Sequence, residues 1–189
     1  FYYEKLLQQV FCAAAITPSM QHSLINKDGI TLSGDGTCVH THASPYGHKA
    51  CGCPNHGKNR CNCPRHYSDP DAHWGWDSAL GACYFGYTLY MLSYHDSQLG
   101  IDLPLHIRFL DAGRHDSVSG IVTLKEFRDL NPGISIQNLC FDSADDNYPA
   151  YNLCNTWGIR PFIDLNDNRG MPKSIPDEIT IIGHGGGGN

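Results

Sequence analysis

The sequence predicts an α/β (α+β) fold, in which a mixed sheet of five strands is flanked by helices. Five segments have the alternating or aromatic-rich composition of strands. Two stretches with helical spacing separate the last three of these segments. A long stretch without periodicity, residues 40–77, stands between the first two strands. With 189 residues, 41% of them hydrophobic and 17% charged, the chain suits one domain with an insertion.

Residues 1–29 are expected to form an N-terminal helical segment. Apolar residues recur at helical spacing over residues 3–16, and Pro18 is expected to end this helix. Lys27, Asp28 and Gly29 then form a turn before the first strand.

The core domain is expected over residues 30–166. Its strands are predicted at 30–39, 82–94, 104–111, 136–141 and 159–165, and its helices at 117–130 and 149–157. Asp116 or Ser117 is the expected N-cap of the first of these helices. Asp145 and Asp146 are expected to favour the N-terminus of the second through its dipole. After Asn166 the pattern fades, so residues 167–189 are expected to be an irregular tail.

Two acids stand at matching places in this pattern. Asp35 ends the first extended segment and Asp142 follows the fourth. Three strands, then helix, strand, helix and strand, put the first and fourth strands side by side in a ribonuclease-H-like sheet. Acids at adjacent strand ends can hold two Mg²⁺ or Mn²⁺ ions about 3.5–4 Å apart. The alternative is that each acid only caps a turn. Asp145 or Asp146 could also take the place of Asp142 as a ligand.

Several blocks of sequence resemble the catalytic domain of DDE-type transposases from bacterial insertion sequences. The resemblance covers about residues 32–166 and implies DNA strand cleavage and strand transfer at two divalent ions. It also implies transposon ends and target DNA as partners, a homodimer in the active complex, and a bacterial cytoplasmic location. Asp35 and Asp142 match the first two acids of the catalytic triad. The matching blocks are Asp35-Gly36-Thr37, the stretch 69–78, Tyr84 to Tyr87, Arg114 to Ser117, Asp142 to Asp146, and Trp157 to Ile163.

The third acid of that triad, a Glu on a helix beyond the fifth strand, has no matching motif. Asp177 and Glu178 lie in a proline-rich stretch instead. We therefore expect a fragment that stops before the catalytic Glu and is inactive by itself. Two other functions stay open: a zinc-ordered DNA-binding or assembly fragment without catalysis, and a different ribonuclease-H-like nuclease.

The stretch 40–77 carries a Cys-rich motif of the form C-x-C-x₇-C-x-C. Four thiolates at this spacing suit a tetrahedral Zn²⁺ ion, which would order a loop that has no core of its own. His48, His56 or His66 could replace one thiolate, and the alternatives are two disulfides or free thiols. The motif residues are Cys51, Cys53, Cys61 and Cys63.

Basic residues gather in the same stretch although the chain carries a formal net charge of −6. No Asp or Glu occurs from Gly36 to Ser68. Phosphate contacts need such cations, so this stretch is the expected DNA-contacting region, although a merely solvated basic loop is the alternative. No apolar stretch is long enough to span a membrane. For Arg114 and His115, which follow the third strand, the alternative to a phosphate contact is a surface turn. The predicted DNA-contacting residues are Lys49, Lys58, Arg60, Arg65, Arg114 and His115.

The aromatic pair Trp74 and Trp76 and the neighbouring Asp77 have two interpretations. Both rings pack on the sheet, or they stack on an unpaired base. Asp77 orients a ligand or caps a turn.

Overall fold

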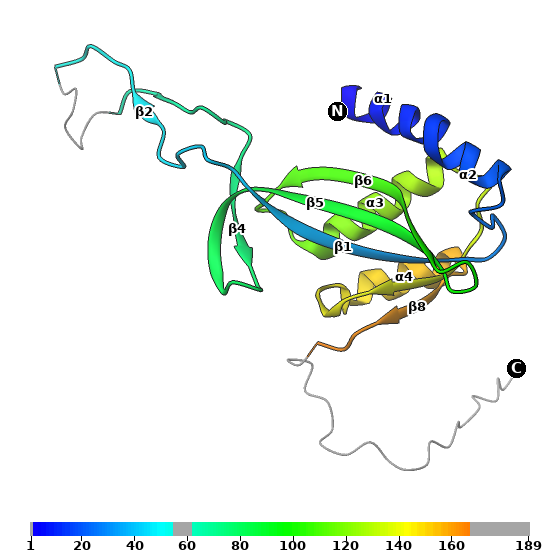
Figure 1. Cartoon of the computed structure of the whole chain (residues 1–189). Helices are drawn as coiled ribbons and strands as arrows, with labels where there is room; N and C mark the ends of the chain where they lie inside the picture. The colour runs from blue at the N-terminus through cyan, green and yellow to red at the C-terminus, as the bar shows by residue number, and fades with distance from the viewer. Residues whose placement is uncertain (1, 55–61, 167–189) are drawn as a thin grey trace, which may run out of the picture.

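The computed structural model describes residues 2–54 and 62–166 and has a mixed sheet at its centre (Figure 1). This sheet has six strands in the described part of the chain, so the prediction of five was wrong. The additional strand is β4, which lies inside the stretch that the sequence analysis left without structure. The strands are β1 Ile30–His40, β4 His73–Asp77, β5 Ala82–Asp96, β6 Ile101–Asp111, β7 Ile136–Phe141 and β8 Arg160–Ile163.

The sheet has antiparallel and parallel halves. The long β5 pairs antiparallel with β1, with β6 and, over residues 82–86, with β4. The pairs β1–β7 and β7–β8 are parallel. Five strands therefore lie in the order β6-β5-β1-β7-β8, with the first and fourth predicted strands side by side. This order is consistent with the ribonuclease-H-like arrangement that the sequence predicts.

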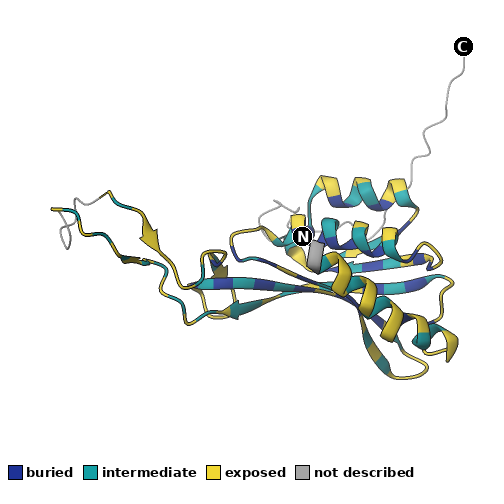
Figure 2. Ribbon diagram, turned by 90° about the horizontal axis from the view of Figure 1, so that it is seen from above, coloured by how far each residue is buried: buried dark blue, intermediate teal, exposed yellow. Residues whose placement is uncertain are grey.

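Helices α3 (Asp116–Leu130) and α4 (Tyr148–Trp157) lie against one face of the sheet (Figure 2). Their apolar side chains meet those of β1, β5, β6 and β7 in one core, which includes Leu32, Tyr90, Leu124, Phe127, Leu139, Phe141 and Cys154. On the opposite face, Met91 is 39% exposed and Phe109 is 51% exposed. Helices α3 and α4 therefore cover one face of the sheet, and much of the other face is open.

The N-terminal helix continues past the proline that was expected to end it. Helix α1 (Tyr2–Phe11) passes through a wide π turn, η1 (Cys12–Ile16), into α2 (Thr17–Gln21). Pro18 stands in the first turn of α2, where a missing N–H costs little. The π turn resets the hydrogen bonds before the proline, because Thr17 N donates to the carbonyl of Cys12, five residues back.

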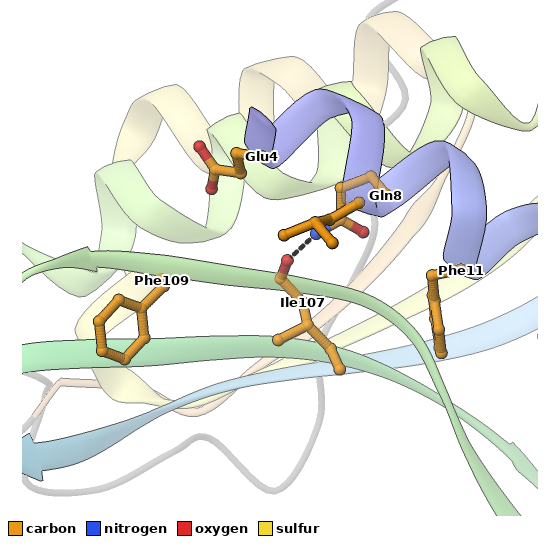
Figure 3. A pocket seen from close by; sticks show the side chains of 6 residues that line it. Glu4, Gln8, Phe11, Ile107 and Phe109 are labelled. Carbon is orange, nitrogen blue, oxygen red and sulfur yellow. Dashed lines mark hydrogen bonds between the residues drawn. The ribbon is translucent and has the colours of Figure 1, made fainter. Parts of the chain in front are cut away.

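Polar contacts hold α1 on the edge strand β6. The side chain of Gln8 donates to the carbonyl of Ile107, beside a pocket that Phe11 and Phe109 also line (Figure 3). The buried Arg108 pairs with Glu4 of α1 at 3.3 Å and with Glu126 of α3 at 2.6 Å. This guanidinium therefore ties α1, β6 and α3 together. In the part of the chain that the structure describes, no helix is both long and apolar enough to cross a bilayer.

The described parts of the stretch between β1 and β4, residues 41–54 and 62–72, form what we call the arm. Its strands β2 (His48–Lys49) and β3 (Arg65–His66) pair antiparallel with each other and not with the main sheet. Figure 1 shows that the arm extends away from the sheet, beyond the end of β1. Contacts with the core therefore do not hold the outer part of the arm in shape.

Candidate functional site

The pairing of β1 with β7 brings the two predicted acids to the same level. The parallel ladder runs through the partners Leu32–Leu139 and Ser33–Cys140. The ladder ends there, two residues before each acid, so Asp35 and Asp142 lie level with each other just beyond its end. Asp35 lies within β1, which continues to His40, and not at the end of the strand as expected.

Both carboxylates are exposed and each accepts a short-range backbone hydrogen bond. Asp35 Oδ1 accepts from the N–H of Gly36 at 2.7 Å. Asp142 Oδ1 accepts from the N–H of Ala144 at 3.1 Å and caps the 3₁₀ turn η2 (Ser143–Asp145). A carboxylate has two acceptor oxygens, so these bonds leave Oδ2 of each acid for another ligand.

Two further acids lie near this pair: Asp116, which the sequence did not indicate as a ligand, and Asp145, which it offered as an alternative to Asp142. Asp116 begins α3, and its Oδ1 lies 3.1 Å from the position that a Cβ would take on Gly36. Asp145 ends η2, is 1% exposed, and has an Oδ1 atom without a hydrogen-bond partner. The hydroxyl of Tyr90 lies against Gly120, as Asp145 Oδ1 does, and is also buried and without a partner. The sequence contains one signal for Asp116: it directly follows the third predicted strand and the turn after that strand.

The acids influence one another electrostatically. Burial raises the pKa of Asp116, and the charges of Asp142 and Asp35 raise it further against an opposing effect of His115. Burial, with the charges of Asp142 and Asp116, raises the pKa of Asp145 to about 7. Burial and all four carboxylates raise the pKa of the Tyr90 phenol. Asp35, Asp116, Asp142 and Asp145 therefore form one acidic cluster where β7 ends beside β1.

Carboxylate oxygens are the ligands that Mg²⁺ and Mn²⁺ prefer. The donor set of the cluster therefore fits the predicted ions. Within the described ranges, however, three acids nowhere bring their ligand oxygens within 4.8 Å of one another. The side chains of the cluster would have to draw together around a cation.

A second candidate metal centre lies in the arm. The sulfur atoms of Cys51, Cys53 and Cys63 all lie within 4.8 Å of one another, and the first two are 3.5 Å apart. Cys61, the expected fourth ligand, lies outside the described residues. Of the candidate replacements, His48 and His66 face each other across β2 and β3 with ring centroids 5.9 Å apart, and His56 lies outside the described residues. Three thiols in this arrangement could hold a metal ion such as Zn²⁺.

The predicted DNA-contacting residues fall into two groups. Lys49 and Arg65 are register partners in β2 and β3, so both lie in the arm. Lys58 and Arg60 lie outside the described residues. The turn before α3 carries the second group, Arg114 and His115.

In that turn, Arg114 lies 3.9 Å from Asp111. His115 is the N-cap of α3, because its Nδ1 accepts from the N–H of Ser117 at 3.3 Å. The expectation that Asp116 or Ser117 caps this helix was therefore wrong. The carboxylate of Asp116 is not used as the cap of its own helix.

The aromatic pair is exposed at the sheet edge. Trp74 is 51% and Trp76 63% exposed, and Trp74 meets Phe85 edge to face. Asp77 Oδ1 accepts from the N–H groups of Ala79 and Leu80, so this acid caps the turn after β4.

Comparisons with known proteins assign no family. No family model matches the chain, and a search of curated proteins finds no match. Among solved structures, the chain is similar to one described as a pre-cleavage Mos1 transpososome, at 10% identity with a TM-score of 0.30. The match covers 84% of this chain and 41% of that one, so the chain spans less than half the length of that protein. A TM-score this low supports neither a fold nor a function.

Proposed function

We propose that these residues belong to the catalytic domain of a DDE-type transposase that cleaves and rejoins DNA strands with divalent metal ions. The observation that carries the proposal is the β1–β7 register, which puts Asp35 level with Asp142. The exposed position of both acids leaves space for a phosphodiester where β7 ends beside β1.

Asp35 would bridge two Mg²⁺ or Mn²⁺ ions and Asp142 would hold one of them. When bound, such ions activate the attacking oxygen and stabilise the leaving oxygen of the phosphodiester. Gly36 has no side chain, which lets the carboxylate of Asp116 approach the backbone beside Asp35. The arm, with Lys49 and Arg65, would contact phosphates of transposon-end or target DNA without reading its sequence. The active complex would be a homodimer.

Strand cleavage in the full-length protein tests this proposal. Supercoiled DNA carrying the transposon ends is incubated with Mn²⁺ and with wild type, Asp35→Asn or Asp142→Asn. Both variants should lose nicking by about 100-fold or more while still binding the DNA ends. Asp28→Asn, an exposed acid in the turn before β1, is the matched control. Wild-type nicking by Asp142→Asn would refute the assignment.

A second candidate is a zinc-ordered DNA-binding or assembly module without catalysis. The three neighbouring thiols of Cys51, Cys53 and Cys63 favour it, because they define a metal site that does not depend on the acids. DNA binding that needs Zn²⁺, together with no Mn²⁺-dependent nicking of the full-length protein, would support this candidate over the first.

A further inference from the structure

Helix α3 places two residues of one face against the acidic end of the sheet. Asp116 and Gly120 are four residues apart and so lie one above the other on the helix. Asp116 Oδ1 packs 3.1 Å from the Cβ position of Gly36. At Gly120, the Cβ position lies 2.7 Å from the hydroxyl of Tyr90 and 3.3 Å from Oδ1 of Asp145.

Two buried polar atoms at this contact have no partner in the described structure. They are the hydroxyl of Tyr90 and Oδ1 of Asp145, and each residue is 1% exposed. An unsatisfied buried hydroxyl or carboxylate costs free energy, and the cost is greatest for a charged group. Such a cost persists at sites whose function needs it. Asp145 Oδ1 is a carboxylate oxygen, so the partner that it lacks is a hydrogen-bond donor or a cation.

The structural roles available to Asp116 do not explain its position. His115 already caps α3, so the helix does not need the Asp116 side chain as its cap. An acid in the first turn does favour the helix dipole. However, an exposed side chain would provide the same interaction, and Asp116 instead lies between α3 and Gly36 of β1.

We infer that Asp116 is a third carboxylate of the acidic site and shares a divalent cation of the Mg²⁺ or Mn²⁺ class with Asp142, beside Asp35. Tyr90 and Asp145 lie behind these ligands as buried positioning residues. This inference rests on the proposed metal site and adds to it a ligand from α3. It ties the start of that helix to the middle of β1 and the end of β7.

Mn²⁺ binding followed by electron paramagnetic resonance tests the inference without DNA or catalysis. Asp116→Asn should bind Mn²⁺ at least ten-fold more weakly than wild type, because it removes one negative ligand. The matched control is Asp129→Asn on the same helix, where the exposed carboxylate pairs with Lys125 at 2.5 Å. This control should bind as wild type does.

Thermal unfolding gives a second measurement. In EDTA, Asp116→Asn should melt at a higher temperature than wild type, because it removes a charge that repels Asp142. With Mn²⁺, the wild-type melting temperature should rise and that of the variant should change little. Gly36→Ala serves as an independent variant, because its methyl group displaces the Asp116 carboxylate while keeping the acid. It should also weaken Mn²⁺ binding.

The outcomes separate the inference from the proposed function. If Asp142→Asn loses Mn²⁺ but Asp116→Asn binds it as wild type does, the third ligand is refuted and the two-acid site stands. If neither variant loses Mn²⁺, the proposed metal site falls as well. A lower melting temperature of Asp116→Asn in EDTA would also overturn the inference, because it would assign Asp116 a structural role.

Discussion

The hydroxyl of Tyr90 lies 2.7 Å from the point where a Cβ on Gly120 would be. Helix α3 therefore approaches β5 so closely that a side chain at position 120 has no space. Tyr90 is 1% exposed and packed in the core, so it cannot turn away at low cost.

The variant Gly120→Ala should accordingly destabilise the protein by about 1–3 kcal/mol, the usual cost of overpacking a core. Gly133→Ala is the control, because a Cβ there meets nothing within 4 Å. Denaturant unfolding measures both. A Gly120→Ala protein as stable as the control would mean that α3 does not pack on Tyr90 in this way.

The sequence predicted the regular core well because its signals are local. The strand at 136–141 and the helix at 117–130 were confirmed to within one residue, since periodicity and flanking turn residues define them. The β1–β7 neighbourhood followed from the order of elements. Local signals failed where a long-range contact decided the structure, as for β4, which forms only by pairing with β5.

The same limit applied to the candidate site. Nothing near Asp116 in sequence shows that it packs on Gly36, because the contact joins residues 80 positions apart in the chain. Similarly, an imidazole was not expected to cap α3, although Nδ1 of His115 does so. For Asp145, the sequence favoured a role at the next helix. Its burial against Gly120 depends on how η2 meets α3.

Acid should destabilise the fold through His106. This residue is 0% exposed, and its burial together with the charge of Arg108 lowers the pKa of the imidazole to about 4 against an opposing effect of Glu4. Below pH 6.5 the unfolded chain binds a proton that the folded chain does not, so stability falls from about pH 6.5 down to about pH 4.

Unfolding free energies between pH 7 and pH 4 check this expectation. Acid lowers the free energy of unfolding, and His106→Gln should remove the part of this loss that His106 causes. That part approaches about 1.4 kcal/mol for each pH unit in this range. The same replacement at the exposed His73 should leave the loss in place. Identical pH profiles for wild type and His106→Gln would show that His106 is not buried as a neutral side chain.

Purified protein should contain about one Zn²⁺ per chain, held by Cys51, Cys53 and Cys63 together with Cys61. Cys53→Ser should lower the zinc content well below that of wild type, whereas Cys83→Ser, at an exposed cysteine in β5, should not. Elemental analysis of protein never treated with chelator measures the content. Less than half an equivalent in the wild type would contradict the zinc site.

Removing this zinc should loosen the arm and leave the rest folded. The main sheet has its own core, and the arm strands β2 and β3 pair only with each other. Hydrogen exchange in EDTA should therefore become faster in residues 41–72 and stay unchanged in β5 and β7. Loss of protection throughout the sheet would contradict this expectation, because it would show that the whole fold depends on the metal.

The last prediction concerns the arm and DNA. Lys49 and Arg65 are register partners on its two strands, and the arm extends away from the sheet (Figure 1). Each cation that neutralises a phosphate releases counterions, and duplex binding then falls with salt with a log–log slope of roughly −0.9 per contact. Replacing both residues by Ala should flatten the slope by about two units and weaken binding equally for all sequences.

A control variant with the same change in net charge shows whether the position of the removed cations matters. Lys27→Ala with Lys125→Ala removes two cations outside the arm, one before β1 and one on α3. This control should change the slope much less. Phosphate contacts carry little sequence information. The ratio of the affinities of the two double variants should therefore be the same for transposon-end DNA and for unrelated DNA. Equal slopes for both double variants would contradict DNA contact by the arm, and metal binding would be its one remaining role.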